Sequence, residues 1–305
     1  MLFIHLGLPK AASTTLQEHL FAKHSQIEYL GKGHSWPEFT KLINSDQDVS
    51  FEMLRCTVDK IAEPAMRNGR VPVLSRPKLV YCNHSQLAIN IERAFGPCKI
   101  ILVVRHPVRW IESLYLERLR ANNIRPNRIP PKLTGYFTLE SYLEHIFSQK
   151  NKSRLKCVMS RSILEPYVMH LGKQNVRVFM LEQLQSDPQS FIAAISRFIG
   201  VDPTEGIRCA AGKREHKRLT HNQVERIKEI HRSPDFTKSL RLAKLPDRCR
   251  MLGPKNRHQL PAEHELATVE FPERWKTQIE DLARDDCNYL RQEWGLPVDE
   301  AGYPL

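Results

Sequence analysis

The chain has 305 residues, 41% of them hydrophobic, which is enough apolar material for one large α/β domain with a real core. Its formal net charge of +12 favours an anionic partner, such as a nucleic acid, an acidic glycan, an anionic lipid surface or a polyanionic cofactor. No apolar stretch approaches the roughly 18 residues of a membrane-spanning helix, and the N-terminal apolar run is too short for a secretion signal.

The seven cysteines are widely spaced, and none forms a C-x-x-C or C-x-H pair. This pattern argues against a disulfide framework and against a structural zinc site. We therefore expect reduced thiols in a cytoplasmic protein that has no transmembrane segment.

Strands alternate with helices along most of the chain. Such alternation predicts a parallel β-sheet flanked by helices, with right-handed crossovers. Ligands of these sheets bind outside the carboxyl ends of the strands, so the segments that follow the strands are the places to look for chemistry. The predicted strands are 2–6, 71–74, 99–104 and 175–181, and the main predicted helices are 51–66, 86–95, 107–120, 188–199 and 272–294.

Two polar stretches interrupt this pattern. Residues 122–134 are rich in proline and basic side chains, and they are predicted to form a loop. Residues 206–261 are also basic, with one helical patch near 222–231, and are interpreted as an excursion or lid. We expect one domain over 1–305, with a core of about 1–201 and a C-terminal helix, 272–294, that docks back on the sheet.

The segment between the first strand and the first helix has the composition of a phosphate-binding loop. Small residues let backbone N–H groups approach a phosphate, and a helix N-terminus adds partial positive charge. Lys10 supplies a mobile charge, and Ser13 or Thr14 is expected to cap the helix. The alternative is an ordinary turn with a surface lysine, and the Walker pattern is absent. The residues expected to bind the anion are Lys10, Ala11, Ala12, Ser13, Thr14 and Thr15.

A second anion site is predicted after the strand at 99–104. Arg105 leaves the sheet at its carboxyl end, and Pro107 suits the first turn of a helix. Arg109 and Ser113 are four residues apart, so they share a helix face. A guanidinium group and a hydroxyl on one side of a helix start suit a monophosphate. The alternative is an amphipathic helix with a solvated basic face.

Together, these two segments resemble the sulfotransferases that use PAPS (3′-phosphoadenosine 5′-phosphosulfate). The run Pro9-Lys10-Ala11-Ala12-Ser13-Thr14-Thr15-Leu16 is similar to the family's 5′-phosphosulfate loop, P-K-[TS]-[GA]-[ST]-T-x-L. Arg105 and Ser113 match its 3′-phosphate motif, an arginine after a strand and a serine in the next helix. The resemblance covers about residues 1–201, and implies a P-loop-nucleotide-hydrolase-like fold of the soluble bacterial type.

The resemblance also implies roles. PAPS would be the co-substrate, with no metal, and Lys10 would contact the oxygen that bridges phosphorus and sulfur and neutralise it as the bond breaks. Ala12 stands where many members have glycine, and alanine fits there only with a negative φ. Glu182 is expected to be structural, bonding loop backbone at the sheet edge.

The general base is the least defined part of the predicted site. Many members of the family place a His or Glu just after the second strand, where this chain reads Leu74-Ser75-Arg76-Pro77-Lys78. The candidates that remain are His34 and Glu38, which follow the first helix. His84 and Glu117 are further candidates. Each of these side chains could instead be an ordinary polar residue.

We therefore expect a transferase that moves a sulfuryl group from PAPS to a hydroxyl or amino group. The acceptor stays open among sugar hydroxyls, amino sugars, lipids and phenolic alcohols. Analogy with bacterial members favours a glycan or lipid, and a nucleic acid is disfavoured. A P-loop-like nucleotide kinase and a non-catalytic basic module that binds polyanions are the alternatives. The basic run at Lys213, Arg214, Lys217 and Arg218 is either a lid over the donor or a solvated loop.

Overall fold

The computed structural model describes residues 1–31, 51–122, 137–148, 155, 159–211, 219–232, 267 and 269–305. Several predictions fall outside these residues. They are the loop at 123–134, the candidate bases His34 and Glu38, and the basic run at 213–218.

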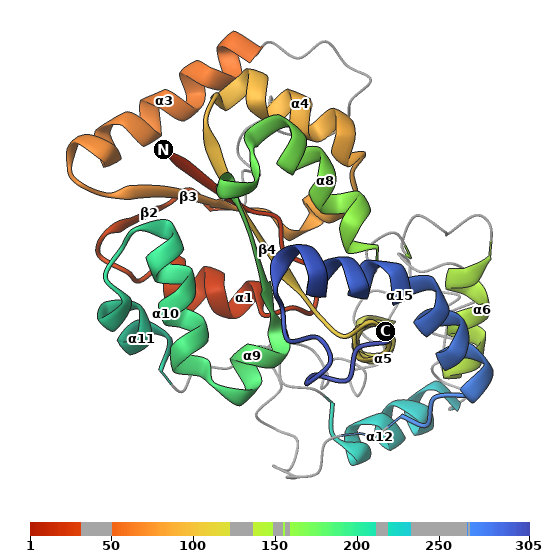
Figure 1. Ribbon diagram of the computed structural model, residues 1–305. Helices are drawn as coiled ribbons and strands as arrows, with labels where there is room; N and C mark the ends of the chain where they lie inside the picture. Colours follow the sequence, from red (N-terminus) through yellow and green to blue (C-terminus); the bar gives the residue numbers. More distant parts are fainter. Residues whose placement is uncertain are drawn as a thin grey trace. The chain divides into compact units, whose positions relative to one another are not determined.

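A five-stranded sheet with the order β2-β3-β1-β4-β5 forms the centre of the fold, and all of its neighbouring strands are parallel (Figure 1). This confirms the predicted sheet. β1 is the middle strand, and its Ile4 pairs with Leu74 on one side and Ile100 on the other. β2 was missing from the sequence prediction because three residues carry too little pattern. The bounds are β1 Leu2–His5, β2 Ile27–Tyr29, β3 Val71–Ser75, β4 Cys98–Val104 and β5 Val176–Met180.

Helices cover both faces of this sheet. Figure 1 shows α3 (Phe51–Arg67), α4 (His84–Phe95) and α8 (Ser160–Leu171) on one side. β4 is buried from Ile100 to Val104, as its β-branched composition on both faces predicted. The other side carries α1 (Ser13–Thr15), the π-helical turn η1 (Leu16–Phe21), α10 (Pro188–Ile199) and α11 (Pro203–Ala210).

Short helices connect these elements. They are η2 (Pro77–Tyr81), η7 (Lys173–Asn175) and α9 (Leu181–Ser186). α10 begins and ends where its sequence predicted. The Asp187 carboxylate accepts a hydrogen bond of 3.0 Å from the Ser190 N–H, and Gly200 ends the helix in the left-handed conformation with φ 86°.

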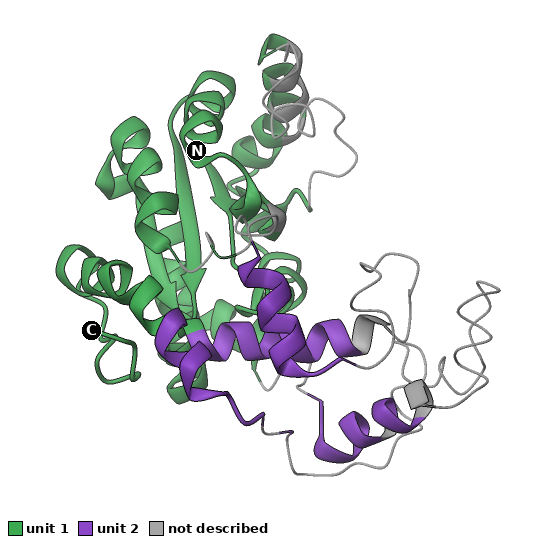
Figure 2. Ribbon diagram, turned by 90° about the vertical axis from the view of Figure 1, so that its right-hand side faces the viewer, with its two compact units in different colours: residues 1–107, 153–215, 280–305 green, residues 108–152, 216–279 purple. Residues whose placement is uncertain are grey.

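The chain forms two compact units, which Figure 2 colours separately. Unit 1 comprises residues 1–107, 153–215 and 280–305, and it contains the whole sheet. Unit 2 comprises residues 108–152 and 216–279. It holds α6 (Leu139–Phe147), α12 (His221–Arg232), most of α5 (Pro107–Asn122) and the first turns of α15 (Glu273–Trp294).

Each unit has its own packing. In unit 2, the rings of Tyr115, Phe137 and Tyr142 cluster with centroids 5.8 to 6.1 Å apart. The helical patch predicted at 222–231 is confirmed as α12. The predicted excursion begins too early, because residues 206–210 belong to α11 in unit 1. A Cβ on Gly206 would lie 2.3 Å from the Ser196 hydroxyl, so α11 packs closely on α10.

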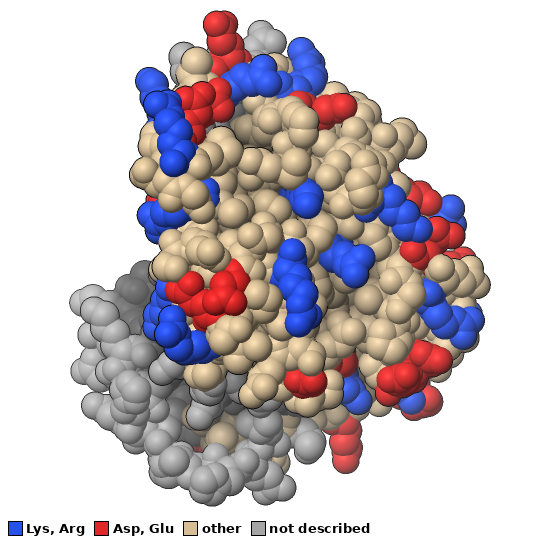
Figure 3. Space-filling model, turned by 60° about the vertical axis from the view of Figure 1, so that its left-hand side comes forward, with Lys and Arg blue, Asp and Glu red and all other residues tan. Residues whose placement is uncertain are grey.

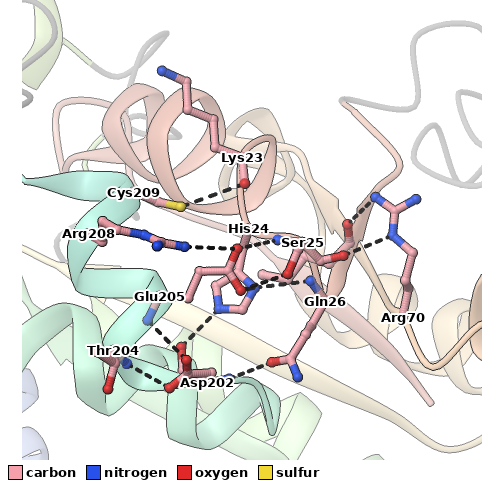
Figure 4. A network of polar contacts seen from close by, with 11 residues as sticks. Lys23, His24, Ser25, Gln26, Arg70, Asp202, Thr204, Glu205, Arg208 and Cys209 are labelled. Atoms are coloured by element: carbon pink, nitrogen blue, oxygen red, sulfur yellow. Dashed lines mark hydrogen bonds and ion pairs between the residues drawn. The ribbon is translucent and has the colours of Figure 1, made fainter.

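A polar network ties α11 to the chain that leads into β2, at the amino edge of the sheet (Figure 4). The buried His24 lies with its Nε2 2.9 Å from the Asp202 carbonyl. The Glu205 carboxylate accepts hydrogen bonds from the Ser25 hydroxyl at 2.7 Å and the Ser25 N–H at 2.9 Å. The bonds from Ser25 lower the pKa of Glu205.

Asp286, in the part of α15 that belongs to unit 1, holds the first turn of α8. Its Oδ1 accepts a hydrogen bond of 2.5 Å from the Arg161 N–H. Burial raises the pKa of Asp286 to about 6, although the same N–H opposes this shift. Between about pH 4 and pH 6 the folded chain therefore binds more protons than the unfolded chain, and stability falls as pH rises through this window.

Replacing Asp286 with Asn should remove this pH dependence. The amide oxygen can still accept from Arg161, while the buried charge is gone. We expect Asp286→Asn to raise the thermal unfolding midpoint at pH 7, with a difference from wild type that vanishes below about pH 4. Differential scanning calorimetry across pH measures this, with the exposed Asp299→Asn as the control. A lower midpoint for Asp286→Asn at pH 7 would contradict the assignment.

Candidate functional site

The loop of Gly7–Leu16 follows the middle strand and is attached to the strands on both sides. Leu6 donates its N–H to the Ile101 carbonyl at 3.0 Å, which extends the pairing with β4 beyond the strand. On the other side, the Arg76 N–H donates to the His5 carbonyl at 3.0 Å. The carboxyl ends of β1, β3 and β4 therefore lie together, as the parallel topology requires.

Position 7 can hold only glycine in this conformation. Its φ is 55°, in the left-handed region. A Cβ would lie 2.7 Å from the Ser13 hydroxyl oxygen and 2.8 Å from two atoms of the His5 ring. The loop backbone is thus packed directly against the side chains around it.

Two further residues of the loop are left-handed, Lys10 with φ 66° and Ala12 with φ 57°. The expectation that Ala12 has a negative φ is wrong. Alanine in this conformation costs about 1–2 kcal/mol relative to the right-handed one, a strain that the glycine common in the family would avoid. Left-handed residues within a loop are typical of the concave backbone arrangements that bind anions.

The helix after the loop begins without the predicted cap. Ala12 is the N-cap residue, so no side chain of Ser13 or Thr14 caps the helix. Ser13 instead donates its hydroxyl to the Leu8 carbonyl at 3.2 Å, which closes the loop from inside. The first N–H groups of a helix have no acceptor within the helix, and here they come directly after a left-handed turn. This is a suitable arrangement for an anion.

Arg105 joins the two predicted anion sites. Its guanidinium Nη1 donates a hydrogen bond of 2.9 Å to the backbone carbonyl of Lys10. One such bond uses one of the five N–H donors of a guanidinium group. The cation that follows β4 therefore touches the loop that follows β1. Ser113 is half-buried on α5, within unit 2, and its role as a phosphate ligand stays a prediction.

The turn after β4 is held in place by hydrogen bonds to distant parts of the chain. Glu182 accepts a hydrogen bond of 3.0 Å from the His106 N–H, which confirms its predicted bonding to loop backbone. The other oxygen of Glu182 accepts from the Tyr303 hydroxyl at 2.9 Å. The His106 Nε2 lies 2.7 Å from the Gly302 carbonyl. Burial raises the pKa of Tyr303 well above its ordinary value, and the Glu182 charge adds to this, so the phenol remains a donor.

Both ring nitrogens of His84 take part in hydrogen bonds, which argues against a role as the general base. Its Nε2 lies 3.0 Å from the Val80 carbonyl, so this nitrogen carries the proton. Its Nδ1 then accepts from the Tyr167 hydroxyl, also at 3.0 Å. Burial lowers the pKa of His84. With both nitrogens engaged, this ring has no lone pair left for an acceptor proton. Glu117 is half-buried on α5 in unit 2 and stays a candidate.

The charge of the chain is unevenly distributed along the sequence. The described residues contain 26 Lys and Arg and 26 Asp and Glu, so the surplus of +12 belongs to the remaining segments. Figure 3 shows basic and acidic side chains interspersed over the face it presents. Within the described residues, no three His, Cys, Asp or Glu side chains gather as metal ligands would. The prediction of a metal-free site is not tested by this.

Substituting Gly7 should damage the loop more than substituting other left-handed glycines. We expect Gly7→Ala to lose more than about 2 kcal/mol of unfolding free energy, because the methyl group clashes and φ is positive. Gly69→Ala is the matched control, since Gly69 has φ 70° and nothing within 4 Å of its would-be Cβ. Its loss should stay near 1 kcal/mol, about the cost of the left-handed conformation alone. Urea denaturation compares the two, and equal losses would refute the packing argument.

Comparison with known proteins adds the family. The model of the family described as "Sulfotransferase domain" matches residues 3–244. Among solved structures, a sulfotransferase from Alicyclobacillus acidocaldarius is 15% identical, with 81% of this chain and 98% of that chain covered and a TM-score of 0.43. Mouse SULT7A1 complexed with PAP is 16% identical, with 94% and 88% covered and a TM-score of 0.41.

A third similar structure is the sulfotransferase domain of the Synechococcus PCC 7002 olefin synthase. It is 19% identical, with 86% of this chain and 95% of that chain covered and a TM-score of 0.40. None of the curated proteins matches the sequence. In the part of the chain that the structure describes, no helix combines the length and apolar character needed to cross a membrane.

The family model identifies the family. That match extends over most of the chain, including the sheet, the loop at Lys10 and the turn at Arg105. The chain belongs to the sulfotransferase domain family.

Proposed function

We propose that this chain transfers a sulfuryl group from PAPS to a hydroxyl or amino group of an acceptor. The observation that carries this proposal is the bond from the Arg105 guanidinium to the Lys10 carbonyl. It joins the segment similar to a 5′-phosphosulfate loop to the segment similar to a 3′-phosphate motif. One nucleotide with an anionic group at each end would need both segments at the same sheet edge.

The residues of the loop fit such a donor. Gly7, Lys10 and Ala12 turn the chain in the left-handed conformation, which is typical of concave backbone that binds anions. The first turn of the helix that starts at Ser13 offers N–H groups without a capping side chain. Two cationic residues, Lys10 and Arg105, suit the negative charge at the two ends of PAPS.

The proposed chemistry is an in-line displacement at sulfur. Bound PAPS supplies an activated sulfuryl group whose bond to the bridging oxygen breaks as the bond to the acceptor atom forms. In this proposal, the Lys10 ammonium group neutralises the charge that develops on the bridging oxygen, and the loop N–H groups hold the adjacent phosphate. Arg105 and Ser113 hold the 3′-phosphate. His34 or Glu38 receives the proton of the acceptor.

An anionic glycan or lipid is the proposed class of acceptor, and the cytoplasm the proposed compartment. The charge distribution supports the acceptor class. The described residues are neutral in sum, whereas the remaining segments contain 20 Lys and Arg against 8 Asp and Glu. Basic segments attract anionic acceptors over a Debye length of about 8 Å at physiological salt.

Ligand-induced thermal stabilisation tests the donor. The probe is PAP (3′-phosphoadenosine 5′-phosphate), which is PAPS without its sulfuryl group. At a concentration of 100 times its Kd, PAP should stabilise the folded chain by about 2.7 kcal/mol, which raises the melting temperature by a few degrees. ATP with Mg²⁺, heparin and duplex DNA serve as comparisons. Stabilisation by ATP with Mg²⁺ alone would support a nucleotide kinase instead. Salt-sensitive stabilisation by heparin or DNA alone would support a non-catalytic polyanion-binding module.

Two single substitutions separate the proposed roles. Lys10→Ala should lower kcat by about 10²–10³-fold and change PAP affinity little, because its charge acts on the bond that breaks. Arg105→Ala should raise the Kd for PAP, and it should also lower kcat because the Lys10 carbonyl loses its donor. Isothermal titration with PAP and initial rates with labelled PAPS measure both, with the exposed Lys23→Ala as the control. Unchanged PAP affinity in Arg105→Ala would refute the 3′-phosphate assignment.

A further inference from the structure

A histidine lies buried against the loop and has no role in the chemistry proposed above. His5 is the last residue of β1, and its side chain has no exposure to solvent. We propose that His5 is a positioning residue of the donor site. Held by Ser75 and Gln17, its imidazole fixes the turn at Gly7 and thereby the placement of Lys10.

The Nδ1 edge of the imidazole is held by two polar side chains, Ser75 and Gln17. The Gln17 amide nitrogen donates to the Ser75 carbonyl at 3.2 Å and to the Ser75 hydroxyl oxygen at 2.8 Å. The carbonyl can only accept, so the amide nitrogen of Gln17 must face it. The Ser75 hydroxyl oxygen, which accepts from Gln17, also lies 2.7 Å from the His5 Nδ1 and forms a hydrogen bond with it.

The other edge of the imidazole faces the loop. Its Nε2 and Cε1 atoms each lie 2.8 Å from the point that a Cβ of Gly7 would occupy. The Ser13 hydroxyl oxygen lies 2.7 Å from the same point, and it is bonded to the Leu8 carbonyl. The imidazole and the Ser13 hydroxyl therefore contact Gly7 on the side where other residues carry a side chain.

A histidine at this position lowers the stability of the fold, so a functional role explains it better than a structural one. Among the described residues, the buried Nε2 of His5 has no hydrogen-bond partner. A buried polar nitrogen without a hydrogen-bond partner costs about 1–3 kcal/mol, a cost that an apolar ring would not incur. Burial lowers the pKa of His5 to about 3, so the ring is neutral and adds no charge to the loop. What it supplies is a contact with the turn by a ring whose orientation Ser75 fixes.

The turn connects His5 to the proposed catalytic lysine. Gly7 and Lys10 are both left-handed, and the Arg105 guanidinium holds the carbonyl of Lys10 from the β4 side. His5 and its Ser75 anchor hold the start of the loop from the β3 side. A shift at Gly7 would therefore move Lys10 relative to Arg105. Misplacement of a reacting group by about 1 Å can cost on the order of 100-fold in rate.

Two substitutions of His5 test its contact with Ser75 and its contact with Gly7 separately. His5→Asn keeps an acceptor near the Nδ1 position and removes the group that faces Gly7. His5→Gln reaches the Nε2 position with an amide N–H. We expect His5→Asn to lower kcat/KM for PAPS by at least about 10-fold, because Lys10 is misplaced, and His5→Gln to stay within about 3-fold of wild type.

The matched control is another buried histidine, at the opposite edge of the sheet. His24 bonds to the Asp202 carbonyl in the network of Figure 4. His24→Asn should lower the melting temperature and leave kcat/KM unchanged. If His5→Asn fails to fold, His5→Ser provides the same comparison, because it likewise removes the group that faces Gly7. Equal kinetics for His5→Asn and His5→Gln would overturn the proposal.

A second measurement separates this proposal from the proposed function, on which its kinetic test rests. Amide hydrogen exchange over residues 6–16 of the free proteins needs no turnover. We expect exchange at least about 10-fold faster in His5→Asn than in wild type, and near wild-type rates in His5→Gln and His24→Asn. If wild type transfers no sulfuryl group, the proposed function fails while exchange still decides the role of His5. Unchanged exchange in His5→Asn would reject that role.

Discussion

The hydrogen bond from the Arg105 guanidinium to the Lys10 carbonyl is the contact on which the proposed site depends. It exists because β1 lies between β3 and β4, so that the segments leaving β1 and β4 meet at one edge of the sheet. Neither segment alone would define a nucleotide site, since each has an ordinary structural interpretation. The bond gives the two cationic residues one shared location, within one compact unit.

Around this bond, the structure shows the same design several times. Backbone groups at the sheet edge are held by side chains from distant parts of the chain. Ser75 and Gln17 fix the His5 ring, while Glu182 holds the N–H of His106. Such contacts determine where the backbone of the proposed donor site lies. The left-handed Ala12 indicates that the loop tolerates local strain in return for a defined shape.

The features that the sequence predicted well have local signals. β4 is a run of buried β-branched residues, and α10 begins with Asp187-Pro188 and ends at Gly200. The features it missed depend on contacts between distant residues. Nothing near Tyr303 points to its bond with Glu182, and nothing near His84 points to Tyr167. The helix start at Ala12 was misassigned because Ser and Thr are common caps, whereas here the Ser13 hydroxyl is used inside the loop.

The hydrogen bonds that hold the turn after β4 have a consequence for synthesis of the chain. Glu182 and Tyr303 are 121 residues apart, and His106 and Gly302 are 196 apart. At a translation rate of about 5–20 residues per second, the ribosome needs roughly 6 to 24 seconds to travel from Glu182 to Tyr303. During that interval the nascent sheet can assemble and Glu182 can bond to His106, but Gly302 and Tyr303, which complete the contacts of this turn, are still missing. The proposed donor site would therefore be completed late in biogenesis, after most of the core has already formed.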